Sequence, residues 1–144
     1  MNERRRFLIA HRGNFFGAKK ERENTISYLT EALEKDFHIE TDVWFINDQF
    51  YLGHDSPTEL TDKHFLTQPK VWCHAKQLNA LYELLAIGAH CFYHTVDSFT
   101  LTSRGYIWTY PGEPLTSRSI CVLPKETTIP NVAGICSDDL SRFI

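Results

Sequence analysis

Histidine, basic and acidic side chains follow apolar, strand-like stretches at three places in this sequence. They are His11 with Arg12 after residues 7–10, Glu40 with Asp42 within residues 39–46, and His74 with Lys76 at the end of residues 71–75. Side chains alternate along a strand, so Glu40 and Asp42 point to the same side. Two such carboxylates repel each other and lose hydration, which a bound cation relieves. The pattern predicts a site for Mg²⁺, Ca²⁺ or Mn²⁺, and the alternative is an exposed edge with two solvated acids.

The segments that must position these groups alternate between strand-like and helix-like patterns. Apolar residues fall at helical spacing over 26–33 and 78–85, with Asn24 or Thr25 placed as an N-cap. Residues 47–48 turn the strand 39–46 into residues 50–52 as a hairpin. Further strands are expected at 71–75, 90–94, 106–110, 119–123 and 132–136, and short helices at 60–66 and near 100–103.

Alternating strands and helices predict right-handed βαβ crossovers and a parallel sheet. The expected fold is α/β: a compact, incomplete or distorted TIM-like (β/α) barrel of mostly parallel strands, with few helices in the second half. A complete eightfold barrel needs roughly 200–250 residues. The chain has 144, so residues 1–144 are expected to form one shortened domain. The later strands lack helices to cover their outer faces, and a second subunit in a homodimer is one way to cover them.

Composition and charge argue against several classes of protein. The formal net charge of −3 gives no electrostatic basis for binding nucleic acid. No apolar run has the length of a transmembrane segment, and residues 7–10 are too few for the core of a signal peptide. The four cysteines lie in apolar, strand-like segments without C-x-x-C spacing. We therefore expect reduced thiols and a cytoplasmic protein.

Four short motifs stand in order along the first half of the chain: HRG at 11–13, EN at 23–24, ETD at 40–42 and GHD at 53–55. Together they resemble the signature of the glycerophosphodiester phosphodiesterase family, part of the phosphatidylinositol-phospholipase-C-like phosphodiesterase superfamily. The resemblance returns weakly at VAGICSD, residues 132–138, which is similar to the family's last strand and terminal aspartate. Each motif alone is weak, whereas the ordered set is specific. The chain thus resembles a shortened member.

The resemblance implies a hydrolase of lipid metabolism that cleaves glycerophosphodiesters or a similar small phosphodiester with the help of a metal. His11 and His54 match the two histidines that act as general base and general acid. Glu40 and Asp42 match metal ligands, with Mg²⁺ expected first and Mn²⁺, Ca²⁺ or Zn²⁺ as alternatives. Arg12 and Lys76 match the basic residues of the family and are expected to hold the phosphate.

Two features depart from the family's pattern. The family has E-x-K or D-x-K on its third strand, where this chain has His74-Ala75-Lys76. His74 is expected to bind the metal and to favour Mn²⁺ or Zn²⁺ over Ca²⁺, with a water ligand or a degraded site as alternatives. The chain is also short, which predicts a small, open site. Two other interpretations therefore stay open: a degenerate, non-catalytic barrel that binds a phosphorylated ligand, and a lyase that releases a cyclic phosphate.

The second half offers further candidates for substrate binding. Tyr106, Trp108 and Tyr110 alternate along one predicted strand and, if they share a face, line the pocket beside an alcohol or sugar leaving group. Trp108 is the expected contact among them, although aromatic residues in strands are more often part of the core. His94, at the end of the preceding predicted strand, is the other expected substrate contact. Asp138 is expected behind the site.

Overall fold

The computed structural model describes residues 5–144, in which ten strands, three short α-helices and one 3₁₀-helix are found. In chain order these are β1 (Phe7–His11), α1 (Ile26–Glu34), β2 (His38–Ile46), β3 (Gln49–Leu52), β4 (Glu59–Thr61), α2 (Lys63–Leu66), β5 (Val71–Ala75), α3 (Leu78–Ala86), β6 (His90–Phe92), β7 (Phe99–Leu101), β8 (Ile107–Thr109), β9 (Ser119–Val122), β10 (Gly134–Ser137) and η1 (Leu140–Phe143). Over this described range, every helix is too short or too polar to cross a membrane.

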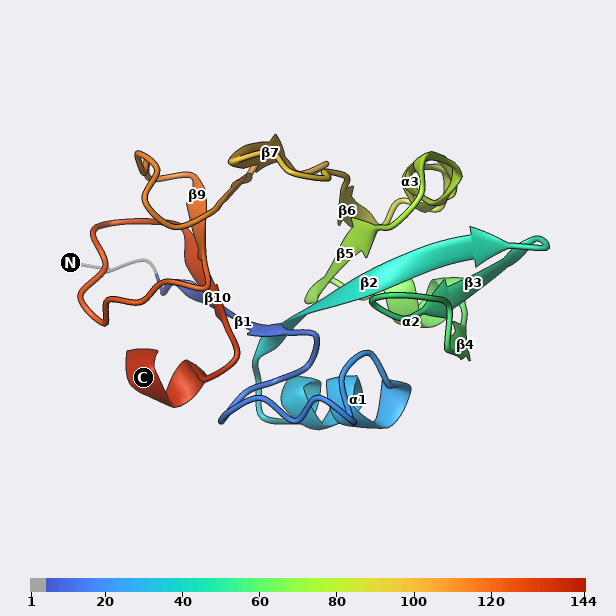
Figure 1. The fold of residues 1–144 in the computed structure, drawn as a ribbon, viewed down its shortest axis with the longest axis horizontal. Helices are drawn as coiled ribbons and strands as arrows, with labels where there is room; N and C mark the ends of the chain where they lie inside the picture. The colour runs from blue at the N-terminus through green and yellow to red at the C-terminus, as the bar shows by residue number, and fades with distance from the viewer. Residues whose placement is uncertain (1–4) are drawn as a thin grey trace.

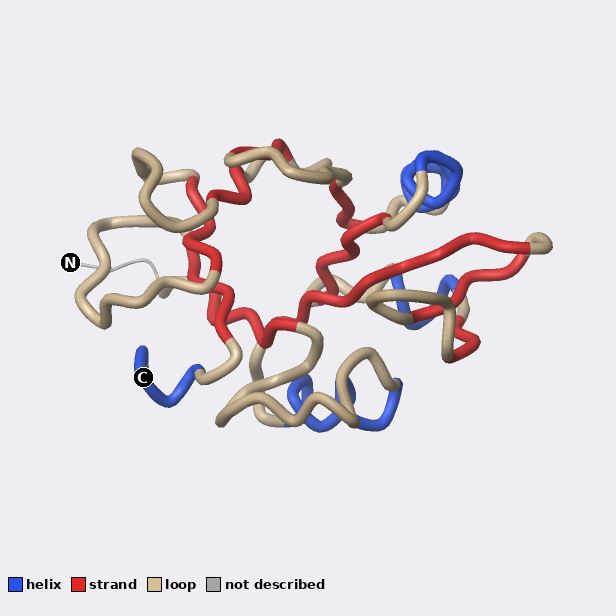
Figure 2. Tube along the Cα trace, in the orientation of Figure 1, coloured by secondary structure: helices blue, strands red, loops and turns tan. Residues whose placement is uncertain are grey.

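The strands form one mixed sheet that curls into a ring in the view of Figures 1 and 2. Its order is β6-β5-β2-β1-β10-β9-β8-β7, and these neighbours are parallel except for β7 and β8. β3 and β4 extend from β2 as an antiparallel meander. Between residues 5 and 144 no ladder joins β6 to β7, and a single backbone bond links Ser103 N to Cys91 O at 2.8 Å. The carboxyl ends of the parallel strands therefore meet at one end of the ring.

The expected fold class, a TIM-like barrel in which helices alternate with strands, is wrong. The structure is a mostly-sheet fold, because only three short α-helices accompany the ten strands and all of them end before residue 87. The connections of the second half explain this difference. Residues 110–118 and 123–133 are interrupted by proline and have no apolar repeat at helical spacing. Loops from these segments, together with Phe143 of η1, cover the outer face of β9 and β10.

Two predicted short helices are also corrected. Within residues 60–66 only α2 is helical, because Asp62 is its N-cap and accepts a hydrogen bond from Phe65 N at 3.0 Å. The residues before it pair with β3 as β4. Near residues 100–103 the chain forms β7 instead of a helix, with Thr100 opposite Trp108 on β8.

Several other local predictions are confirmed. Thr25 caps α1 by accepting a hydrogen bond from Tyr28 N at 3.3 Å. Asn47 and Asp48 have φ of 52° and 60°, the left-handed conformation that a tight two-residue hairpin requires. Strands are found where residues 7–10, 39–46 and 71–75 predict them. All four cysteines are free and buried.

Apolar side chains fill both faces of the curled sheet. The inner face carries one cluster from six strands: Ile9, Trp72, Phe92, Trp108, Ile120, Val122 and Cys136. On the outer face, α1 and α3 pack on β2 and β5 through residues such as Leu29 and Leu84. The inside of the ring is therefore a packed core. Trp108 and Val122 of this core also form the floor of a cavity at the carboxyl ends of the strands.

Candidate functional site

A cavity of about 330 Å³ lies where the parallel strands end. Its walls carry the nine residues predicted to act in catalysis, metal binding or substrate binding: His11, Arg12, Glu40, Asp42, His54, His74, Lys76, His94 and Trp108. Tyr93 and Tyr110 complete the wall on the side of β6 and β8. Residues from both halves of the sequence thus meet in one place.

The register of the strands explains why the polar side chains converge. On β1 and β2, His11 lies opposite Glu40, and on β2 and β5, Asp42 lies opposite His74. Glu40 and Asp42 are two residues apart, and both line the cavity, as their alternation predicts. Lys76 follows β5 directly, and its backbone N bonds to Val43 O at 2.9 Å, which prolongs the pairing of β5 with β2.

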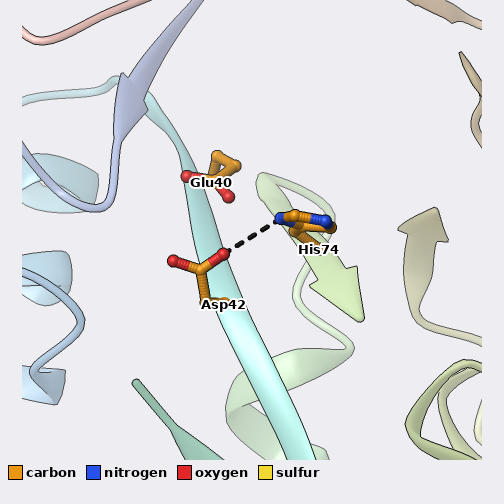
Figure 3. Close-up of side chains that lie close together, drawn as sticks. All are labelled: Glu40, Asp42 and His74. Carbon is orange, nitrogen blue, oxygen red and sulfur yellow. Dashed lines mark hydrogen bonds and ion pairs between the residues drawn. The ribbon is translucent and has the colours of Figure 1, made fainter. Parts of the chain in front are cut away.

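Glu40, Asp42 and His74 form a buried group that could hold a metal ion. Each offers one ligand atom, and these atoms lie within 4.8 Å of one another. Figure 3 shows the carboxylates on β2 and the imidazole on β5 facing the same space, with His74 Nδ1 3.0 Å from Asp42 Oδ1. That separation is about the edge of an octahedron with metal–ligand distances of ~2.1 Å. The donor types and their spacing therefore fit a divalent metal.

The imidazole of His74 is held in the orientation that a metal ligand needs. Its Nε2 lies 3.4 Å from the carbonyl oxygen of His94, which only accepts hydrogen bonds. The ring lies parallel to those of Phe92 and His94, at centroid distances of 5.2 and 4.4 Å. With its proton on Nδ1, the imidazole donates to Asp42 Oδ1 at 3.0 Å; with its proton on Nε2, Nδ1 keeps a lone pair that could bind a metal beside Asp42.

The two carboxylates of this group are compensated to different degrees. Burial raises the pKa of Glu40, and the charge of Asp42 raises it further. Burial also acts to raise the pKa of Asp42, but hydrogen bonds with His54 and His74 outweigh it and hold that pKa well below its usual range. Asp42 is thus stabilised as an anion by its neighbours, whereas Glu40 is a buried acid whose charge a bound cation would balance.

Asp138 orients His11. Nδ1 of His11 lies 2.8 Å from Asp138 Oδ1, and because a carboxylate only accepts, this nitrogen carries the proton. Nε2 lies 4.0 Å from Glu40 Oε1 on the cavity side. Burial lowers the pKa of His11, but the hydrogen bond to Asp138 and the charge of Glu40 outweigh burial, so the pKa is raised. Asp138 therefore lies behind the site, as predicted.

His54 reaches the cavity from the loop after β3, and Gly53 makes this loop feasible. Gly53 has φ of 152°, and a Cβ there would lie 1.8 Å from Ser56 O. His54 Nδ1 donates to Asp42 Oδ2 at 3.3 Å, and Nε2 accepts from Arg12 Nη2 at 3.1 Å. His11 and His54 thus both direct Nδ1 to a carboxylate, while the Nε2 of His11 lies on the cavity side and the Nε2 of His54 accepts from Arg12.

Arg12 and Lys76 supply the positive charge of the cavity wall. The guanidinium of Arg12 lies 3.3 Å from Glu23 Oε1 through Nη1 and 3.6 Å from Asp42 Oδ2 through Nε. Among residues 5–144 this buried Nε has no hydrogen-bond partner. Lys76 Nζ lies 3.9 Å from Asp42 Oδ1. An anion in the cavity would therefore meet two cations and the imidazoles together.

The aromatic wall is built differently from the sequence prediction. His94 lines the cavity, and its Nε2 lies 2.9 Å from Tyr110 Oη. Trp108 lines it as a buried part of the floor. Tyr106 packs against the same inner cluster as Trp108 and Tyr110, but it lies on Phe7 and Trp72 in the core and does not line the cavity, which is the alternative that the sequence left open for these aromatic residues.

Asn24 is the site residue that the sequence reasoning missed. It is buried with φ of 58°, its Nδ2 donates to Asp42 Oδ2 at 3.0 Å, and its Oδ1 accepts from Thr41 Oγ1 at 2.8 Å. The same oxygen accepts from the backbone N of Asp42 at 3.0 Å. Asn24 therefore fixes the orientation of the Asp42 carboxylate. The EN motif was the signal, and its Glu23 holds Arg12.

Comparisons of the chain with known protein families, curated proteins and solved structures gave no match. The activity of a relative therefore contributes nothing to the inference of function. What bears on function is the geometry of the cavity and the set of motifs that the sequence carries.

Proposed function

We propose that this protein is a metal-dependent phosphodiesterase that hydrolyses glycerophosphodiesters or a similar small phosphodiester. One observation carries the proposal: two imidazoles, each oriented by a carboxylate, share a cavity with a group suited to a divalent metal. Oriented proton-transfer groups are needed for catalysis and not for binding alone. The resemblance of the HRG, ETD and GHD motifs to phosphodiesterases supports the same class of reaction.

Glu40, Asp42 and His74 are the residues that would hold the metal. Their two carboxylates favour Mg²⁺, and the imidazole nitrogen leaves Mn²⁺, Ca²⁺ and Zn²⁺ as alternatives. When bound, a divalent metal neutralises the charge of its carboxylate ligands and of a phosphate oxygen. The buried, poorly compensated charge of Glu40 supports this assignment.

His11 and His54 would carry the proton transfers. One imidazole accepts the proton of the attacking hydroxyl or water through Nε2, and the other donates a proton to the oxygen of the leaving alcohol. One phosphorus–oxygen bond forms while another breaks, and the two protons balance. Asp138 and Asp42 keep the Nδ1 protons in place, so each ring presents the same nitrogen throughout.

Arg12 and Lys76 would bind the phosphate, Arg12 through its planar fork and Lys76 as a point charge. In the structure Arg12 donates to His54 Nε2. A phosphate oxygen that takes over this donor would free His54 Nε2 for proton exchange. Tyr110 and His94 face the cavity from the opposite wall, where the alcohol of the diester would lie, with Trp108 beneath it.

The test is turnover of a panel of glycerophosphocholine, glycerophosphoethanolamine and a chromogenic phosphodiester, with each divalent metal or with EDTA. We expect activity that EDTA removes and that falls at least about 100-fold in His11→Ala and His54→Ala. His64→Ala is the matched control, because His64 lies on α2 away from the cavity and should leave activity unchanged. Phosphate binding without turnover would favour a non-catalytic module, and a cyclic phosphate as the sole product would favour a lyase.

A further inference from the structure

The outer face of α3 exposes an apolar stripe. Leu78, Tyr82 and Leu85 are spaced four and three residues apart, so they lie on one side of the helix, and they are 71%, 71% and 53% exposed. The other side of α3, with Ala80 and Leu84, is buried in the outer core. A surface helix normally turns charged and polar residues outward. Here both sides of the helix are apolar.

Strand β7 and the loop before it continue this surface. Phe99 and Leu101 are two residues apart on β7, Leu101 is 70% exposed, and Val96 in the preceding loop is 94% exposed. Arg104 Nη2 lies 3.4 Å from Gly88 O, so the turn after β7 contacts the turn after α3. Figure 1 shows α3 and β7 on either side of β6. We name this surface the α3–β7 face, made of Leu78, Tyr82, Leu85, Val96, Phe99 and Leu101.

The size and charge of the α3–β7 face match those of a protein interface. Residues of this size present up to ~150–250 Å² each when fully exposed. Because the six are between 45% and 94% exposed, they present roughly 800 Å² together. That area is about one partner's share of a standard interface. Among the residues of α3 and β7 the sole charge is Glu83, and the loop between β6 and β7 adds Asp97. Depletion of charge is typical of interface cores, whereas free surface strands usually carry protective charges.

We propose that a second copy of this chain covers the α3–β7 face, giving a homodimer. An apolar, nearly uncharged surface is complementary to itself, and two-fold symmetry would pack the two α3 stripes across an axis near Tyr82. An anionic membrane fits less well, because Arg104 is the one basic residue among the charges at this part of the described structure, beside the acidic Glu83 and Asp97. The second copy would also cover β7, which belongs to the half of the described sheet that has no α-helix. This inference does not depend on the proposed activity.

The oligomeric state of the full chain tests the proposal. Light scattering after gel filtration and sedimentation equilibrium should give twice the 16.7 kDa chain mass at micromolar concentration. Tyr82→Glu should weaken the dimer roughly 1,000-fold, because a central interface residue is worth roughly 30-fold and occurs twice. Leu101→Lys on β7 should act in the same direction. Leu60→Glu is the control, since Leu60 is 54% exposed on β4 outside the face, and it should remain dimeric.

Each of these substitutions replaces an exposed side chain, so circular dichroism and thermal unfolding should show the same fold in all variants. A wild-type chain that stays monomeric at hundreds of micromolar would overturn the homodimer. A dimer that survives both Tyr82→Glu and Leu101→Lys would place the interface elsewhere and overturn it as well. A monomer that binds anionic vesicles through Tyr82 would reassign the face to a membrane.

Discussion

Glu40→Gln removes a buried charge from the metal group and preserves the size of the side chain. The ligand atoms of Glu40 and Asp42 lie within 4.8 Å of each other. At an effective dielectric constant of about 20, two like charges at this distance repel by about 3 kcal/mol. His11, His74 and Arg12 act to lower the pKa of Glu40, which offsets part of this repulsion. Without metal, we therefore expect the free energy of unfolding of Glu40→Gln to be about 1–2 kcal/mol larger than that of wild type, which makes the variant the more stable protein.

Metal should reverse this order. A metal ion at about 100 times its Kd stabilises the protein that binds it by about 2.7 kcal/mol. Glu40→Gln lacks one of the charged side chains that would bind the metal, so it should gain less of this stabilisation. Urea unfolding in EDTA and in saturating Mg²⁺ or Mn²⁺ measures both effects. The variant should be the more stable protein in EDTA, and wild type should be the more stable protein in metal.

Glu34→Gln is the control for charge removal, because Glu34 is exposed at the end of α1. It should shift neither stability nor the response to metal. A Glu40→Gln protein that is less stable than wild type in EDTA and keeps the full stabilisation by metal would refute this prediction. That result would mean that Glu40 is structural and that no cation shares its site.

Three further predictions concern other parts of the site and core. Gly53→Ala should lower kcat more than about 100-fold, because a Cβ collides with Ser56 O and displaces the catalytic loop; normal kinetics would contradict this. Asp138→Asn should lower kcat about 10²–10⁴-fold with little change in KM, because it removes the charge behind His11; an unchanged pH–rate profile would argue against it. Burial and the charge of Arg104 lower the pKa of His90 to about 3. In the unfolded chain His90 has a pKa of ~6.5, so above this pH its burial in the neutral form does not lower the free energy of unfolding. As the pH falls from ~6.5 toward 3, the unfolded chain binds a proton that the folded protein does not, and the free energy of unfolding falls by roughly 1–2 kcal/mol at about pH 5. Urea unfolding at pH 7 and 5 should show that His90→Gln loses less stability on acidification than wild type does. An equal loss in both proteins would contradict the role of His90.

The sequence predicted the parts of the site that depend on strand alternation. Glu40 and Asp42 face one cavity because they are two residues apart, and His74 joins them because β5 is the parallel neighbour of β2. Asn24 was not foreseen as the partner of Asp42, because its contact needs a buried left-handed residue brought across from the loop before α1. The EN motif marks Asn24 in the sequence, but its contact with Asp42 depends on tertiary structure.

The prediction of the fold failed where local patterns are weakest. Few helices were expected in the second half, where the connections contain proline and short polar runs, but the antiparallel return of β7 against β8 is not part of a (β/α) barrel. Thr100 is compatible with a helix cap as well as a strand, and its pairing with Trp108 decided between them. Packing on Phe7 and Trp72 likewise decided that Tyr106 belongs to the core, one of the two interpretations that the sequence left open.

The most direct test of the central claim is the phosphorus NMR spectrum of glycerophosphocholine incubated with the purified protein and Mg²⁺ or Mn²⁺. We predict that the diester signal is replaced by that of a phosphomonoester, that EDTA prevents the change, and that His11→Ala lacks it. A diester signal that persists with folded, metal-loaded protein, for this substrate and for the rest of the panel, would contradict the assignment of this cavity as a phosphodiesterase site.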